Sequence, residues 1–246
     1  KKIAIIERNK QQGQLLAEYL KAKGFEVRLL DKISSLQEAQ EFLGAERLDI
    51  LLLDIAPQEG LSTAEIQEIN AEFCLALTRT LKNNIRFKNL VVILLTSERA
   101  VPKIAQAIES GVDNIIIQEP WAGAIPESVG IFFNKITFRE KNVLDLNFIN
   151  FLLEISSQAD REDFFILAPV IFNRLFLDKF RPIIGETVVN SILQRLEGLT
   201  SPQYSFMHKI RFQEGRIHME EVEKASKEVS VQHLSFAFRD YLYAFI

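Results

Sequence analysis

Four polar side chains follow apolar runs of the sequence, at points where strands of a sheet are expected to end. Glu7, Asp54, Thr96 and Gln118 each come directly after at least three consecutive apolar residues. The carboxyl ends of parallel strands meet at one crevice, so we expect these side chains to lie close together. Carboxylates beside a hydroxyl suit phosphoryl transfer or magnesium binding. A plainer interpretation stays open, because strand ends also carry polar residues where the chain meets water.

Five short apolar runs must position these side chains. They are Ile3–Ile6, Phe25–Leu30, Ile50–Leu53, Leu90–Leu95 and Ile115–Ile117. Each run is nearly continuous in apolar residues, as in a parallel sheet that is covered by helices on both faces. Apolar residues at helical spacing follow each run. The sequence therefore predicts an α/β fold, a five-stranded doubly wound parallel sheet with its ligand site beyond the carboxyl ends of the strands.

The remainder of the chain has a different pattern. Residues 139–246 show apolar stripes at helical spacing, and only Met207–Phe212 resembles a strand. Twelve of the 19 phenylalanines lie after residue 140. We therefore expect two domains, an α/β domain at 1–138 and a mainly helical module at 139–246. The apolar residues of 231–246 predict either part of the module's core or an exposed stripe for self-association.

Several segments within residues 1–138 resemble, in this order, a response-regulator receiver domain. They are Ile3–Asn9 with Leu15 and Leu16, Lys23–Val27, Leu48–Ile55, Leu94–Ser97 and Ala107–Asn114. The resemblance implies the receiver (flavodoxin-like) fold and a place in two-component signal transduction or a phosphorelay. It also implies that Asp54 stands at the phospho-acceptor position and Thr96 at the switch-hydroxyl position.

Two positions depart from what this resemblance implies. A receiver holds magnesium with two adjacent acids after its first strand and the acceptor aspartate, and a lysine after its fifth strand neutralises phosphoryl charge. Here the acidic pair reads Glu7-Arg8, and Gln118 or Glu119 stands at the lysine position. A guanidinium is permanently charged and repels a divalent cation. These substitutions predict a degenerate receiver, or pseudo-receiver, without ordinary magnesium-dependent phosphorylation.

The site keeps two alternatives open. In the first, Arg8 replaces the metal and pairs with Asp54 as a guanidinium–carboxylate pair, which stabilises the ionised acid without metal or phosphate. In the second, the protein is a response regulator that is phosphorylated at Asp54, with a helical output or DNA-binding module. Any magnesium ion would then be held by Glu7 and Asp54. We expect no resident cofactor, and magnesium only if the receiver site is functional.

Composition narrows the choice of partners. The chain of 246 residues carries a formal net charge of −4, and residues 141–246 hold 12 basic against 14 acidic side chains. A duplex-binding module normally presents a basic face, so nucleic acid is an unexpected partner. The sequence holds no phosphate-binding glycine loop and no nucleophile elbow, and its three histidines match no compact metal-ligand spacing. We expect no enzyme activity.

The sequence also bears on the compartment in which the protein works and on its partners. A single cysteine, Cys74, is typical of a reducing compartment, and no apolar run is long enough to span a membrane. We therefore expect a cytoplasmic interaction protein that does not bind membranes. Its expected partners are signalling proteins, such as a histidine kinase or another regulator, and a second copy of itself in a homodimer.

Overall fold

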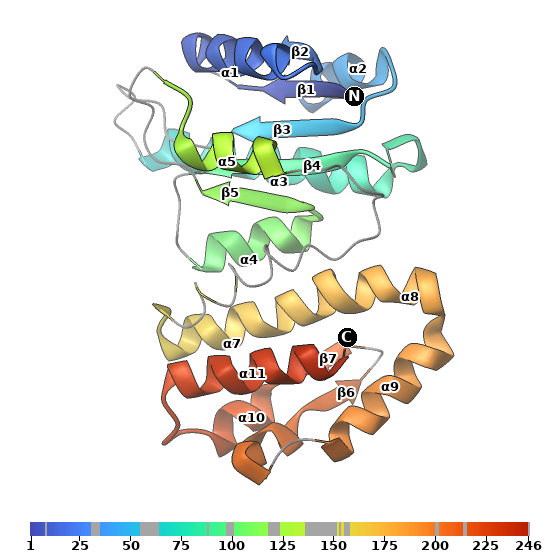
Figure 1. Ribbon diagram of the computed structural model, residues 1–246, viewed down its shortest axis with the longest axis vertical. Coiled ribbons are helices and arrows are strands. Elements are labelled where there is room, and N and C mark those ends of the chain that lie inside the picture. Colours follow the sequence, from blue (N-terminus) through green and yellow to red (C-terminus); the bar gives the residue numbers. More distant parts are fainter. Residues whose placement is uncertain are drawn as a thin grey trace. The chain divides into compact units, whose positions relative to one another are not determined.

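The computed structural model describes residues 1–7, 9–30, 35–54, 64–87, 89–96, 101–117, 124–135, 152, 154, 158–199, 202–213 and 216–245. The chain divides into two compact units (Figure 1). The first is formed by Lys1–Arg99 with Gln106–Lys141, and the second by Ala100–Ala105 with Asn142–Ile246. The boundary that the sequence predicts, between residues 138 and 139, lies outside the described residues.

The first unit is built on a five-stranded sheet. Its strands are β1 (Lys2–Ile6), β2 (Glu26–Leu30), β3 (Ile50–Asp54), β4 (Val91–Thr96) and β5 (Asn114–Ile117). They lie in the order β2-β1-β3-β4-β5, and every neighbouring pair is parallel. This is the strand order of the flavodoxin-like doubly wound fold. The predicted parallel sheet is confirmed.

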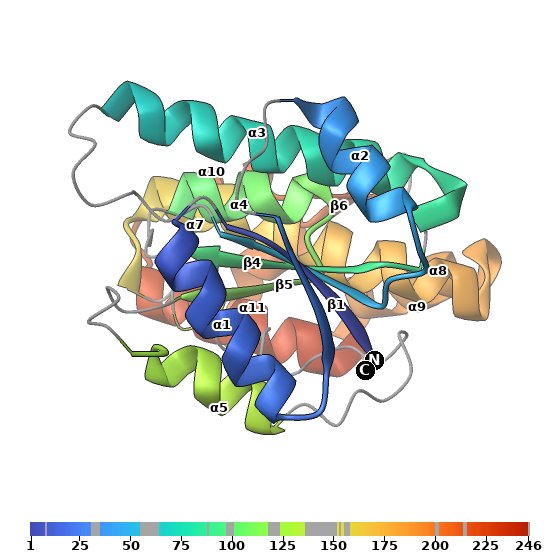
Figure 2. The same ribbon diagram turned by 90° about the horizontal axis from the view of Figure 1, so that it is seen from above.

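Helices cover both faces of this sheet. They are α1 (Lys10–Ala22), α2 (Leu36–Gly44), α3 (Ala64–Asn83), α4 (Val101–Ser110) and α5 (Glu127–Lys135), with a 3₁₀ turn η1 (Ile85–Phe87) after α3. Figure 2 shows α1 and α5 on one face and α2, α3 and α4 on the other. On the α1–α5 face, Leu16 and Phe133 pack with alternate strand residues such as Ile5 and Leu52. Burial on both faces explains the continuous apolar runs in β1, β3, β4 and β5, whereas β2 at the edge of the sheet carries Glu26 and Arg28.

The second unit is mainly helical, as predicted. It contains α7 (Arg161–Val170), a π-helical stretch η2 (Ile171–Leu177), α8 (Asp178–Ile184), α9 (Glu186–Leu199), a 3₁₀ segment η3 (Pro202–Lys209), α10 (Glu220–Ala225) and α11 (Val231–Phe245). Phe164, Phe172 and Phe238 are completely buried. The ring centroid of Phe238 lies 6.1 Å from that of Phe164 and 6.5 Å from that of Phe172. Phenylalanine therefore supplies the centre of this unit's core.

Arg161 ties the start of α7 to the turn that follows α10. Its guanidinium donates hydrogen bonds to the carbonyl oxygens of Val229 (3.0 Å) and Glu223 (3.1 Å) and to the hydroxyl of Ser226 (2.8 Å). The Ser226 side chain is completely buried. A planar fork of donors can serve three acceptors at once, which a lysine ammonium cannot do in the same geometry.

One expectation for the second unit needs correction, and the choice left open for residues 231–246 is decided for the described side chains. Met207–Phe212 is not one strand, because Met207 and its neighbours lie in η3 and only β6 (Arg211–Gln213) is extended, paired antiparallel with β7 (Arg216–His218). The apolar residues of α11 do not form one exposed stripe. Phe238 and Leu242 are buried in the core, whereas Phe236 is 50% exposed.

None of the described helices is both long enough and apolar enough to cross a bilayer.

Candidate functional site at the carboxyl edge of the sheet

Three of the predicted site residues end three adjacent strands. Ile6 of β1 is in register with Leu53 of β3, so Glu7 and Asp54 follow at the same level of the sheet. Asp54 is in register with Leu95 of β4, and Thr96 is the next residue along that strand. The sheet therefore places two carboxylates and a hydroxyl at one edge, with Asp54 on the middle strand of the three.

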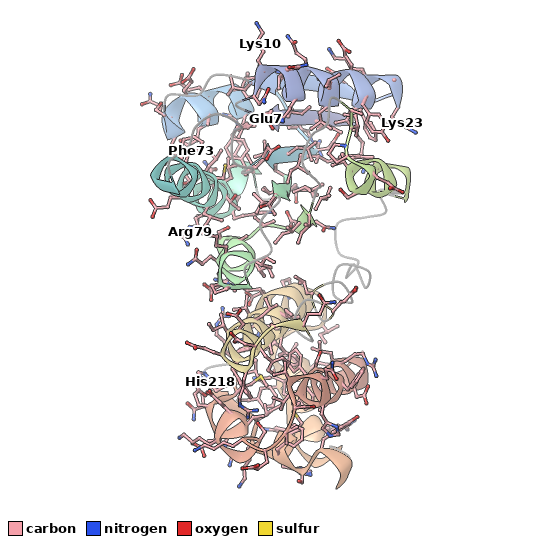
Figure 3. All side chains as sticks on the ribbon, turned by 90° about the vertical axis from the view of Figure 1, so that its left-hand side faces the viewer. Glu7, Lys10, Lys23, Phe73, Arg79 and His218 are labelled. Atoms are coloured by element: carbon pink, nitrogen blue, oxygen red, sulfur yellow. The ribbon has the colours of Figure 1, made fainter. Side chains whose placement is uncertain are left out.

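Glu7 is held by the turn between β1 and α1. Its side chain is 5% exposed, and its Oε1 accepts a hydrogen bond of 2.6 Å from the backbone N–H of Asn9. Asn9 in turn caps α1, since its side-chain oxygen accepts from the backbone N–H groups of Gln11 and Gln12. Figure 3 shows Glu7 at the sheet beside α1. The carboxylate is thus fixed against the beginning of a helix, where negative charge is favoured.

Gly13 allows α1 to approach Glu7 closely. A Cβ atom at this position would lie 3.1 Å from Cγ and 3.2 Å from Cβ of Glu7, and 2.8 Å from Cδ1 of Leu29. The absence of a side chain at Gly13 therefore shapes the wall of the site. Sequence reasoning missed this residue, because an isolated glycine within a helical pattern does not identify the side chains that approach it.

Asp54 and Thr96 are less open to water than typical polar residues at the end of a strand. Asp54 is half-buried, and Thr96 is 2% exposed. The backbone carbonyl of Asp54 lies 4.0 Å from Sγ of Cys74 in α3, and Cys74 is itself buried. A buried thiol in an apolar setting acts mainly as a small hydrophobic side chain. Cys74 therefore supports the end of β3 from the α3 face.

The other predicted site residues fall outside the described residues. These are Arg8 and Gln118, together with Glu119, the alternative at the lysine position. The pairing of Arg8 with Asp54 therefore remains a prediction.

The donor set does not match the magnesium site that the sequence resemblance implies. That site takes three carboxylates, and this chain supplies Glu7 and Asp54 with Arg8 in place of the third. One oxygen of Glu7 already accepts a backbone N–H. Within the described ranges, no three His, Cys, Asp or Glu side chains gather in a way that could hold a metal ion. A guanidinium in the ligand set opposes a divalent cation by direct charge repulsion.

Comparison with known proteins gives likenesses in structure only. No family model matches the sequence, and no curated protein matches it. A two-component response regulator from Clostridium difficile is 21% identical with a TM-score of 0.40, over 55% of this chain and 91% of that one. The chemotaxis response regulator CheY4 of Vibrio cholerae is 15% identical with a TM-score of 0.40, over 55% and 96% of the two chains.

A third likeness is to HP1043, an orphan response regulator of H. pylori, at 17% identity and a TM-score of 0.39, over 54% and 93% of the two chains. Identities this low speak to fold alone, and the fold follows independently from the strand order. The first unit has the flavodoxin-like fold.

Proposed function

We propose that the protein is a two-component-type signalling protein whose first unit is a degenerate receiver that acts by protein–protein contact. The observation that carries the proposal is the composition of the sheet edge. Glu7, Asp54 and Thr96 end adjacent parallel strands, whereas the sequence places Arg8 at the second acidic position and Gln118 after β5. The scaffold of a phospho-acceptor site is retained without two of its charged groups.

The missing charges bear directly on phosphoryl transfer. The transferred group carries negative charge that metal ions and cationic side chains must neutralise in the transition state. Loss of one such preorganised group typically costs about 3 to 4 kcal/mol, or a factor of 10² to 10³ in rate. Two losses at Arg8 and Gln118 would slow phosphorylation of Asp54 by several orders of magnitude. Such a rate is too slow for a switch.

A different role follows for Arg8. Arg8 follows Glu7 in the sequence and comes two residues after the end of β1, the strand that pairs with the Asp54 strand β3. Paired with the Asp54 carboxylate, it would hold a fixed charge arrangement at the sheet edge and keep the unit in one conformation. The unit would then present a constant surface to a histidine kinase or another regulator.

The second unit serves, in this proposal, as the module that carries the interaction onward, including association of two copies of the chain. Its sequence is acidic overall, and its interior is a packed phenylalanine core. Neither property suits a duplex-binding surface, which needs several phosphate-neutralising side chains on one face.

Restoring the missing charges tests the proposal. The double variant Arg8→Asp, Gln118→Lys is incubated with acetyl phosphate and magnesium, and intact mass is measured over time. We expect the double variant to gain one phosphoryl group at a rate at least 100-fold above that of the unmodified chain. Asp54→Asn in the same background is the matched control and should gain none. Equal rates for the double variant and the unmodified chain would refute the claim that Arg8 and Gln118 are what slows phosphorylation of Asp54.

A second candidate is a response regulator phosphorylated at Asp54. The retention of Asp54 and Thr96 at the ends of adjacent strands favours it. In that case the unmodified chain accepts a phosphoryl group readily, and the substitutions at Arg8 and Gln118 do not increase the rate of phosphorylation.

A further inference from the structure

The helix from α7 to α8 contains an unusual stretch beside the β6–β7 hairpin. Residues 171–177 are π-helical. This conformation is rare in proteins, and where it occurs it is often found at functional sites. Asn173 in this stretch makes two hydrogen bonds to the backbone of Ile217 in β7. Its Oδ1 accepts from the Ile217 N–H (2.8 Å), and its Nδ2 donates to the Ile217 carbonyl (3.3 Å). These two bonds fix β7 against the helix.

This arrangement brings three arginines to one carboxylate. Asp178 begins α8, and its Oδ2 accepts a hydrogen bond of 3.1 Å from Nη1 of Arg174. Its Oδ1 lies 3.6 Å from Nη2 of Arg216, the residue before Ile217. The same oxygen lies 3.8 Å from Nη1 of Arg181. Asp178 thus receives one hydrogen bond and two longer charge contacts.

Among the described residues, two carboxylates approach these three arginines and do not fully neutralise them. Besides Asp178, Glu186 approaches the cluster, with its Oε1 3.6 Å from Nε of Arg181. Three guanidinium charges against these two carboxylates leave an excess of one positive charge, in a unit whose sequence is net negative. Opposite charge is therefore attracted to this point of the unit.

Arg181 shows where hydrogen-bonding capacity is left over. Its Nε and Nη2 atoms are buried and have no hydrogen-bond partner among the described residues. The Arg181 side chain as a whole is 19% exposed, so part of it reaches the surface although Nε and Nη2 do not. A buried N–H without an acceptor costs free energy, and a charged one costs more. An incoming group with several acceptor oxygens would remove this cost.

We propose that Arg174, Arg181 and Arg216 form a binding site for a phosphate-type oxyanion, with Asp178 occupying part of the site until the ligand arrives. A tetrahedral phosphate or phosphomonoester offers several acceptor oxygens to guanidinium forks, whereas the Asp178 carboxylate offers two. The excess positive charge attracts a phosphoryl group, which carries a charge of about −1.5 to −2 at pH 7. A nucleic-acid strand would need a longer run of basic side chains. All four residues of this site belong to the second unit.

Inorganic phosphate and phenyl phosphate are the probes, titrated into the full chain at constant ionic strength with chloride as the reference anion. Binding is measured by calorimetry and by the ¹⁵N–¹H signals of the arginine Nε groups. We expect saturable binding that shifts these signals. Tighter binding of phenyl phosphate would assign the site to phosphorylated molecules, and tighter binding of inorganic phosphate to the free ion.

Two variants weaken the site and one strengthens it. Arg216→Gln and Arg174→Gln, whose side chains are 42% and 41% exposed and are therefore tolerable to the fold, should each weaken phosphate binding at least tenfold. Asp178→Asn should tighten it, because a competing negative charge is removed. Arg195→Gln, at an exposed position of α9, is the matched control and should leave binding unchanged.

Three results would overturn the proposal. The first is the lack of any saturable response to phosphate or phenyl phosphate. The second is an equal loss in the Arg195→Gln control, which would mean non-specific charge attraction. The third is tighter binding of a short DNA duplex than of either phosphate, lost in the Arg216→Gln variant, which would assign the arginines to nucleic acid. Circular dichroism of each variant confirms that the fold is retained.

Discussion

Replacement of Gly13 by alanine tests the close approach of α1 to the candidate site. The new Cβ would lie 2.8 Å from Cδ1 of Leu29 and 3.1 Å from Cγ of Glu7. Carbon atoms in optimal contact are about 3.5 to 4.0 Å apart. Leu29 can move its side-chain end, but Glu7 is held by the Asn9 N–H. Overpacking of this kind costs about 1 to 3 kcal/mol.

A second glycine provides the matched control. Gly130 is the fourth residue of α5, as Gly13 is the fourth residue of α1. A Cβ at Gly130 would meet only Oη of Tyr19, at an ordinary 3.7 Å. Alanine is more favourable than glycine within a helix by about 1 kcal/mol. We therefore expect Gly130→Ala to stabilise the protein by up to about 1 kcal/mol, and Gly13→Ala to be neutral or destabilising by up to about 2 kcal/mol.

Urea unfolding of the two variants and the unmodified chain measures this difference. The free energy of unfolding should be about 1 to 3 kcal/mol lower for Gly13→Ala than for Gly130→Ala. Hydrogen exchange at the Asn9 amide should also quicken in Gly13→Ala, because displacement of Glu7 weakens that hydrogen bond. Equal stabilisation by the two substitutions, with unchanged exchange at Asn9, would refute the packing described around Glu7.

Two further predictions concern the second unit. Arg161→Lys should lower the free energy of unfolding by about 1 to 3 kcal/mol, because a lysine cannot keep all three hydrogen bonds of Arg161. Urea unfolding measures this loss. A loss below about 0.5 kcal/mol, the range of ordinary surface substitutions, would contradict the prediction. Burial and the hydrogen bond to Asp240 raise the pKa of Tyr204 above its ordinary value of 10.0. The folded chain therefore keeps this proton to a higher pH than the unfolded chain does. As a result, the free energy of unfolding falls as pH rises above about 10. Tyr204→Phe should reduce that alkaline loss in unfolding measured between pH 8 and 11, and an unchanged slope would show that Tyr204 does not contribute.

The parallel sheet could be predicted because its signal is local and repeated. Four of the five strands of the first unit contain a continuous, largely buried apolar run, and only β2, with Glu26 and Arg28, does not. The edge residues Glu7, Asp54 and Thr96 followed from the rule that sites lie beyond the strand ends. Gly13 was missed because its role depends on the distance between α1 and two side chains of other elements, which no local pattern contains.

The second unit shows where sequence patterns fail. The π-helical stretch 171–177 changes the helical period, so residues such as Asn173 and Arg174 take positions that a period of 3.6 does not give. Arg216 joins them from a hairpin more than 40 residues away. The charge balance of residues 141–246 predicted no basic cluster, yet folding brings three arginines to Asp178. A total charge contains no information on such long-range contacts.

The central claim is that the first unit keeps the scaffold of a phospho-acceptor site without its ordinary chemistry. Incubation of the unmodified full chain with acetyl phosphate and magnesium, followed by intact-mass measurement, tests it most directly. The account predicts that the mass stays unchanged at times that suffice for stoichiometric labelling of an active receiver run in parallel. Stoichiometric addition of one phosphoryl group, lost in the Asp54→Asn variant, would contradict it.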